Sequence, residues 1–315
     1  MKNISVISAT SGSNNTYSSS AEDLPSKAEG IALCSAFAVE AVFIVLGNLL
    51  TILLFAVYRE FRKKSLFLVI NMAFADLMLG AVSLPGHIYL LGEHYQLWSA
   101  SRLHTFLDNF FNITETVFLQ GSLLFAAMIS VERFYAIFWP LKHRTVTVRA
   151  YRIVIFVVWT LAILVSAIFF ILFSLIASRH AIYSLMSYLL TLLLIVCGCN
   201  IGIWRKFQQE SIPSHQQNRS SQNKRLTKTL LFVSAAALLS WLPVIIVYYL
   251  AFSSTVLSLP GYTVDVAFVL CYSNSSVNPL VYALRIPEFR HALGLCCFRR
   301  QTAEQPGKMM TELPL

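Results

Sequence analysis

Ionisable side chains interrupt the apolar stretches of this 315-residue chain. The stretch FAAMISVERFYAIFWPLKHR, residues 125–144, places Glu132 and Arg133 side by side near the end of an apolar run. Asp76 and Glu115 lie inside two other apolar runs. Burying a charge away from water costs several kcal/mol unless it meets a partner or a cavity, so these four residues are the first candidates for function.

The chemistry that these residues can support is ion pairing and hydrogen bonding. Amide and hydroxyl side chains accompany the charges in the apolar stretches, at Asn48, Ser122, Asn274, Ser275 and Asn278. Taken one at a time, such residues more often act as contacts between helices, worth about 0.6 kcal/mol. The apolar stretches contain neither a His and Glu metal-binding set nor a Ser–Lys pair at one depth. An intramembrane enzyme is therefore not expected.

The composition indicates which elements position these residues. The chain is 57% hydrophobic and 12% charged, whereas a soluble domain carries roughly twice that charged fraction. Seven apolar segments approach the ~20 residues that cross a bilayer, and a backbone in lipid must satisfy its own hydrogen bonds as a helix. The sequence thus predicts an all-α membrane protein, a bundle of seven transmembrane helices at residues 31–58, 65–91, 103–137, 151–176, 181–204, 226–252 and 262–284.

The distribution of basic residues predicts the orientation in the membrane. All but four of the 24 Lys and Arg residues follow the first, third, fifth or seventh segment; the exceptions are Lys2, Lys27, Arg102 and Arg179. By the positive-inside rule, the N-terminus is extracellular and the C-terminus cytoplasmic. The net charge of +9 therefore reflects topology, and a nucleic-acid partner is not needed to explain it.

Short motifs in six of the seven segments resemble those of one family. They are Asn48 in GN, Asp76 in NMAFADL, the ERF motif at residues 132–134, Trp159, SWLP at 240–243 and NPLVY at 278–282. Together they resemble the signature of rhodopsin-like G-protein-coupled receptors, over residues 31–298. The resemblance implies a multi-pass plasma-membrane receptor that binds an extracellular small molecule and activates a heterotrimeric G protein. A seven-helix transporter or channel remains the alternative, although no internal repeat is visible.

The resemblance also implies a domain organisation. Residues 1–30 are polar and form an extracellular disordered tail, in which Asn3 and Asn14 are glycosylation sequons. Residues 31–285 form the seven-helix receptor domain, 286–298 a short amphipathic eighth helix, and 299–315 a cytoplasmic tail. Cys296 and Cys297, near the end of this segment, are candidate palmitoylation sites, with plain packing as the alternative.

The family resemblance gives the Glu132–Arg133 pair a role. In such receptors the arginine is restrained by the neighbouring acid in the inactive state and packs against the G protein in the active state. The family's usual second acid, at the base of helix 6, is replaced by Asn223. We therefore expect the ion pair between Glu132 and Arg133, called the latch below, to restrain the arginine without a second acid. The other expected activation residues are Trp241, Pro243, Asn278, Pro279 and Tyr282.

Two binding sites are implied at different depths. The first is an allosteric Na⁺ site at Asp76, with oxygen ligands at Ser122, Asn274, Ser275 and Asn278; a water network around a protonated Asp76 is the alternative. The second is the ligand site. Glu115 lies 18 residues before Arg133 and thus five helical turns outward, where amine receptors of the family carry an acid. Its expected neighbours are Tyr272, Trp241, Thr116, Leu119, Ser184, Tyr248 and Phe268.

The ligand class stays open. A biogenic amine is the first hypothesis, and a nucleoside, lipid or peptide is the alternative, because Glu115 could instead pair with an internal cation or water. Retinal is not expected as a cofactor, since Tyr272 stands where the family's retinal lysine lies. The family's outer disulfide is not expected either: Asp108 replaces its first cysteine, and the outer loop around Ser178–His180 has none. Leu192, Asn200 and Ala237 replace further family residues in helices 5 and 6.

Overall fold

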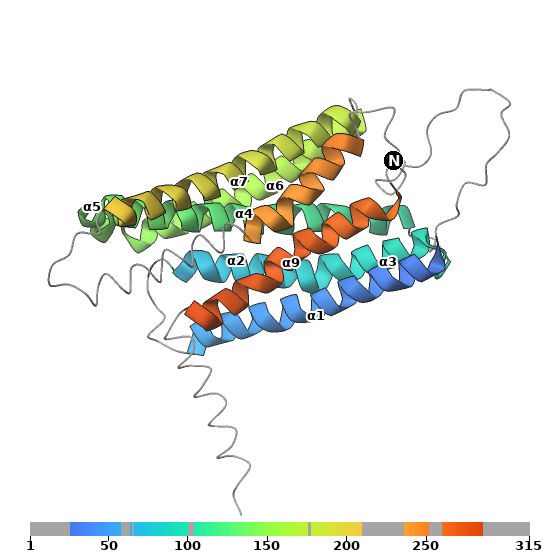
Figure 1. Cartoon of the computed structure of the whole chain (residues 1–315), viewed down its shortest axis with the longest axis horizontal. Coiled ribbons are helices and arrows are strands. Elements are labelled where there is room, and N and C mark those ends of the chain that lie inside the picture. Colours follow the sequence, from blue (N-terminus) through green and yellow to red (C-terminus); the bar gives the residue numbers. More distant parts are fainter. Residues whose placement is uncertain are drawn as a thin grey trace, which may run out of the picture.

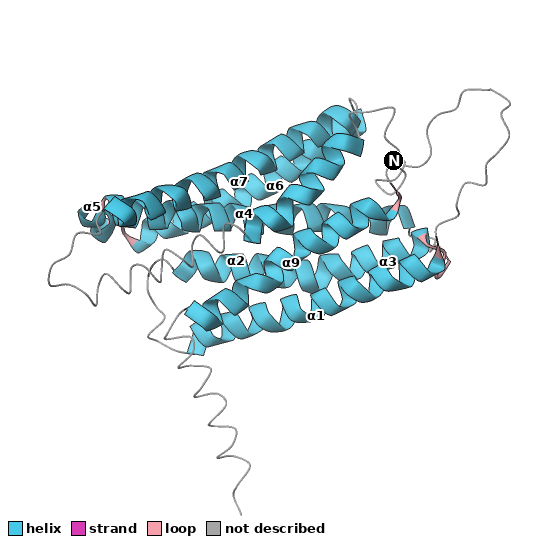
Figure 2. Ribbon diagram, in the orientation of Figure 1, coloured by secondary structure: helices cyan, strands magenta, loops and turns pink. Residues whose placement is uncertain are grey.

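The structure is a computed structural model that describes residues 26–57, 64, 66–99, 104–175, 178–209, 236–251 and 260–285. Asn3, Asn14, Asn223, Cys296, Cys297 and the segment 286–298 lie outside these ranges, as does the side chain of Tyr282. Within them the chain is helical and contains no strand (Figure 2).

The helices follow the predicted order. They are α1 (Lys27–Val57), α2 (Leu66–Met78), the π-helix η2 (Leu79–Ser83), α3 (Leu84–His94), α4 (His104–Phe138), α5 (Pro140–Thr145), α6 (Val148–Leu175), α7 (Ser178–Gln209), the helix Ala236–Ala251, and α9 (Tyr262–Arg285). Where both ends are described, the predicted ends lie within five residues of the observed ones. One expectation is wrong: Ser178–His180 form the first turn of α7 and not an outer loop.

Most of the described helices are long enough to cross a membrane. Five segments, counting α2, η2 and α3 as one, are long and apolar enough to span a bilayer. The described part of the sixth predicted span, Ala236–Ala251, is a shorter apolar helix. Large apolar side chains such as Phe43, Phe156 and Leu164 are exposed on the outside of the bundle. An apolar outer surface of this kind suits contact with lipid.

Helix α4 is the axis of the bundle. It packs against α2, α3, α6 and α7, whereas α1 packs against α2, α3 and α9 (Figure 1). One core cluster surrounds Phe125 of α4 and Trp241, and a second one joins Phe37 of α1 to Leu79, Leu84 and Tyr272. Side chains on α4 can therefore contact α2 and α3 on one side of this helix or α6 and α7 on the other.

A π-helix separates α2 from α3. Pro85 lies in the first turn of α3 and has no N–H to donate to the preceding turn, and η2 occupies that turn. A π-turn accommodates an extra residue, and one residue of a helix corresponds to about 100° of rotation. The side chains of α3 therefore face a different direction from the one that an unbroken helix from Leu66 would give them.

Gly86 allows α3 to approach α4 closely. A Cβ atom at Gly86 would lie 2.1 Å from ring carbons of Phe111, whereas a Cβ at Gly198 of α7 would have no neighbour within 4 Å in the described part of the chain. The missing side chain at Gly86 therefore sets the distance between α3 and α4 at this level.

We expect Gly86→Ala to destabilise the protein and Gly198→Ala to leave it as stable or more so. Overpacking at Gly86 should cost about 1–3 kcal/mol, whereas alanine in an open helical position gains up to about 1 kcal/mol over glycine. Melting temperatures of the two detergent-purified variants give the comparison. Equal melting temperatures would show that the close approach at Gly86 is not a packing constraint.

Candidate functional site

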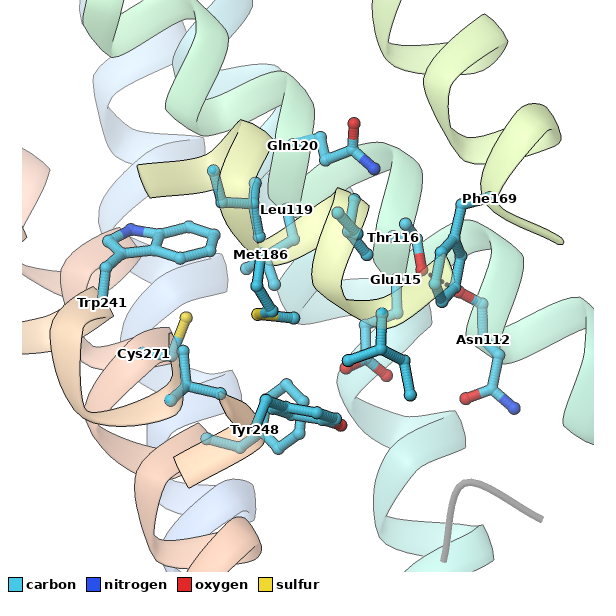
Figure 3. Close-up of a pocket in the computed structure, with 15 residues that line it drawn as sticks. Asn112, Glu115, Thr116, Leu119, Gln120, Phe169, Met186, Trp241, Tyr248 and Cys271 are labelled. Carbon is cyan, nitrogen blue, oxygen red and sulfur yellow. Dashed lines mark hydrogen bonds between the residues drawn. The ribbon is translucent and has the colours of Figure 1, made fainter. Parts of the chain in front are cut away.

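A cavity opens between α4, α6, α7, α9 and the helix Ala236–Ala251. Its volume, including space open to solvent, is about 750 Å³. It is lined by Asn112, Glu115, Thr116, Leu119, Gln120, Phe169, Ile182, Leu185, Met186, Leu189, Trp241, Val244, Tyr248, Phe268 and Cys271. Figure 3 shows Trp241 and Cys271 on one side and Glu115 on the other. The lining is mostly apolar, with a few polar groups from α4, which is the usual character of a small-molecule site.

Glu115 supplies the carboxylate of this lining. It is only 9% exposed, and its two oxygens have different partners. The hydroxyl of Tyr272 in α9 donates to Oε1, and Nδ1 of His87 in α3 lies 3.3 Å from Oε2. The carboxylate thus joins three helices, and both of its oxygens already meet groups of the protein itself.

His87 is the site residue that the sequence analysis missed. Its ring centroid lies 4.8 Å from that of Phe37 and 5.8 Å from those of Phe268 and Tyr272. Its Nε2 atom is buried and has no hydrogen-bond partner among the described residues. An ionisable residue in the apolar run after Pro85 was the available signal, but its direction depends on η2.

The ligand residues predicted from the sequence are mostly brought together. Glu115, Thr116, Leu119, Trp241, Tyr248 and Phe268 line the cavity, and Tyr272 reaches it through its bond to Glu115. The prediction for Ser184 is wrong. Its side chain is exposed and outside the lining, and its hydroxyl donates to the His180 carbonyl at 2.9 Å.

A tyrosine–aspartate bond ties the far end of α3 to α9. The hydroxyl of Tyr95 donates to Oδ2 of Asp265 at 3.3 Å. Burial, together with the nearby Asp265 carboxylate, raises the pKa of Tyr95, so that the phenol remains a donor. On α4, the side-chain amide of Asn112 donates to Asp108 at 2.7 Å. Among the described residues, the free thiols are those of Cys34, Cys197, Cys199 and Cys271.

A second polar centre surrounds the fully buried Asp76 of α2. Nδ2 of Asn278 donates to Oδ2 of Asp76 at 3.0 Å. Oδ1 of Asp76, Oγ of Ser122 and Oδ1 of Asn48 are buried without a hydrogen-bond partner among the described residues. Ser275 is buried and its carbonyl accepts from Asn48, whereas Asn274 is buried but forms no described hydrogen bond to Asp76. Unpartnered oxygens around a carboxylate fit a hard cation or ordered water.

A third polar centre holds Glu132 at the other end of α4. Arg133 Nε lies 3.5 Å from Oε2 of Glu132. Oε1 accepts from the Tyr151 hydroxyl at 2.9 Å and lies 2.8 Å from Nε2 of His143. We expected Glu132 to be held only by its pair with Arg133. The structure adds two partners to the Glu132 carboxylate, one from α5 and one from α6.

Two prolines predicted to take part in activation lie inside helices. Pro243 is in the helix Ala236–Ala251, two residues after Trp241, whose indole is 1% exposed. Pro279 is buried in α9 against α1, where a Cβ atom on Gly47 would lie 2.9 Å from its ring. Tyr282 is in the last turns of α9.

Comparison with known proteins identifies the family. A model of the 7 transmembrane receptor (rhodopsin family) matches residues 47–180 and 172–282. The growth hormone secretagogue receptor type 1 of Sus scrofa is 27% identical, over 80% of this chain and 77% of the relative. Trace amine-associated receptor 8b of Rattus norvegicus is 26% identical, over 84% of this chain and 86% of the relative.

A solved structure has a similar fold. The crystal structure of squid rhodopsin superposes with a TM-score of 0.72 at 18% sequence identity, covering 93% of this chain and 94% of the other. The family model spans most of the helical bundle, including Glu115, Asp76 and Glu132 with the polar groups around them. The chain therefore belongs to the rhodopsin family of seven-transmembrane receptors, and it is a receptor and not an enzyme.

Proposed function

We propose that this plasma-membrane receptor binds an extracellular amine at Glu115 and responds by activating a heterotrimeric G protein. The observation that carries the proposal is a buried carboxylate in the wall of a mostly apolar cavity. The similarity to trace amine-associated receptors supports the same ligand class. The basic residues that follow alternate helices support an extracellular N-terminus and a cytoplasmic C-terminus.

The surroundings of Glu115 suit an ammonium group with an apolar substituent. A carboxylate–ammonium contact in water contributes only about 0–1 kcal/mol. In a desolvated site, removing one of the two partners costs about 3–5 kcal/mol, because the other charge stays buried. Tyr248, Phe268 and Trp241 add aromatic surfaces to the cavity, and such faces attract cations and bury apolar groups. Retinal is not part of the proposal, because α9 contains no lysine to carry it.

A ligand that is not an amine, such as a nucleoside, lipid or peptide, is the second candidate. The growth hormone secretagogue receptors are as similar to this chain as the trace amine-associated receptors are. Both oxygens of Glu115 also have partners within the protein, so the carboxylate does not require a ligand for its charge to be compensated. The two candidates differ in whether the active compound must be a cation.

Signal transfer in this proposal runs along α4. Glu115, Ser122 and Glu132 lie on this one helix, at the cavity, beside Asp76 and at the latch. Pro243 and Pro279 lack backbone N–H donors, so the helix Ala236–Ala251 and α9 can bend there. Movement of these helices on ligand binding would release Arg133 from Glu132 for contact with the G protein.

We expect Glu115→Gln to weaken the potency of an active amine by about 100-fold or more. Removing one partner of a desolvated charge pair costs about 3–5 kcal/mol, and each 1.4 kcal/mol is tenfold. Tyr272→Phe should cost less, about 1.5–3 kcal/mol, because it removes one hydrogen bond to a charged group.

The measurement is a dose–response series over amines, nucleosides, lipids and short peptides in cells with matched surface expression. Ser184→Ala is the control, because this hydroxyl lies outside the cavity. An active compound without a cation, or a full response by Glu115→Gln, would refute the amine proposal and leave the receptor family intact.

The Asp76 centre should respond to sodium. In the proposed Na⁺ site, Asp76, Ser122, Ser275 and Asn278 supply oxygens, with Asn274 as the fifth expected member. We expect the melting temperature of the purified receptor to rise when Na⁺ replaces a large inert cation, since binding to the folded state stabilises it. Asp76→Asn should remove the dependence. A sodium-insensitive wild type would instead favour a water network at Asp76.

Arg133→Ala should abolish ligand-stimulated nucleotide exchange on the G protein while surface expression stays largely unchanged. The reason is that Arg133 is the proposed contact for the G protein, whereas its pair with Glu132 is partly exposed and contributes little to stability. Exchange rates in membranes and surface labelling of intact cells measure the two properties. Normal exchange in the variant would remove the latch from the mechanism.

A further inference from the structure

The imidazole of His87 is held in the way that a cationic ligand of Glu115 would be held. Its Nδ1 atom faces Oε2 of the carboxylate at 3.3 Å. The rings of Phe37, Phe268 and Tyr272 surround it with centroid distances of 4.8–5.8 Å. An acid together with aromatic rings is the setting that proteins use to bind an ammonium group. Here a side chain of the receptor fills it.

We propose that His87 is an internal cation that competes with the ligand's ammonium for Glu115, so that the receptor's response to amines depends on extracellular pH. The inference rests on the proposed function of Glu115 as the amine site. It adds a residue from α3 that decides when a cation can bind there. His87 acts as a specificity residue because it must yield its contact with Oε2 before an ammonium can take it.

Negative and polar groups face His87 from the helices packed against α3. Glu115 approaches from α4, and Tyr272 and Asp265 approach from α9, the latter within electrostatic range. From α1, Phe37 supplies an uncharged ring, and Glu40 lies farther along the same helix, with a buried Oε2 that has no hydrogen-bond partner among the described residues. The nearby Glu115 and Asp265 carboxylates favour a protonated imidazole and burial opposes it, and histidine is the side chain that changes its charge in the physiological pH range.

The exchange balances as one cation for another. With His87 protonated, the Glu115 charge is neutralised, and an ammonium entering the cavity would meet a like charge beside its carboxylate. With His87 neutral, Glu115 retains a full negative charge for the ligand. Amine binding therefore releases one proton from His87 to water, and the neutral ring can remain among Phe37, Phe268 and Tyr272.

Amine potency should therefore rise with pH across the range in which histidine titrates. We expect the potency of tyramine or 2-phenylethylamine to increase on the order of tenfold between about pH 6 and about pH 8, while the amines themselves stay protonated. His87→Gln keeps a hydrogen-bond donor toward Glu115 but cannot acquire a charge. This variant should respond equally at both pH values and exceed the wild type at acidic pH.

The matched control is His180→Gln, since His180 is an exposed histidine in the first turn of α7 and should not affect the pH profile. If the response requires Glu115 but the wild type shows no pH dependence, or His87→Gln keeps it, the inference is overturned and the proposed function stands. If neither amine acts through Glu115 at either pH, the proposed function fails.

A measurement without ligand tests the His87–Glu115 pair directly. Melting temperatures of the wild type, His87→Gln, Glu115→Gln and the double variant form a thermodynamic cycle. We expect a coupling on the order of a few degrees at about pH 6 that shrinks at about pH 8 as His87 loses its proton. Equal coupling at both pH values would overturn the inference whatever the amines do.

Discussion

The burial of the Glu115 carboxylate between three helices is the constraint on which the cavity depends. An acid at this depth needs partners, and the protein provides Tyr272 from α9 and His87 from α3. These two contacts connect α4 to the half of the molecule formed by α1, α3 and α9, on the opposite side from α6 and α7. Whatever binds at Glu115 must therefore replace or extend contacts that hold the helices together, which is a direct way for a ligand to bias their arrangement.

The backbone of α3 supplies the geometry that this interaction needs. Pro85 follows the π-helix η2, and the extra residue turns the helix that carries His87. Gly86 then allows α3 to lie against Phe111 of α4. A proline, a π-turn and a glycine would each weaken an isolated helix, and π-turns are frequent at functional sites. Their combination next to His87 is consistent with a segment shaped for recognition.

Two histidines partner two acids near opposite ends of α4, the buried Glu115 and the partly buried Glu132. His87 contacts Glu115 at the cavity, and His143 contacts Glu132 together with Arg133 and Tyr151. Each acid thus has partners from different helices, and these contacts offset the desolvation of its charge. For Glu132 this arrangement supplies attachments from α5 and α6 that the sequence, with Asn223 in place of the usual acid, did not suggest. The latch is connected to the segment after α4 as well as to Arg133.

The sequence by itself determined the class of the protein and most of its parts. Apolar segments of membrane-spanning length must be helices, because lipid leaves the backbone no other hydrogen-bond partners, so the helix limits could be predicted to within a few residues. Spacing along one helix also placed Glu115, Ser122 and Glu132 at successive depths. Only the tertiary structure decided which groups meet them. His87, His143 and Tyr151 come from other helices, and Ser184 faces outward, because rotation about each helix axis depends on packing and on irregular turns such as η2, which leave no periodic signal in the sequence.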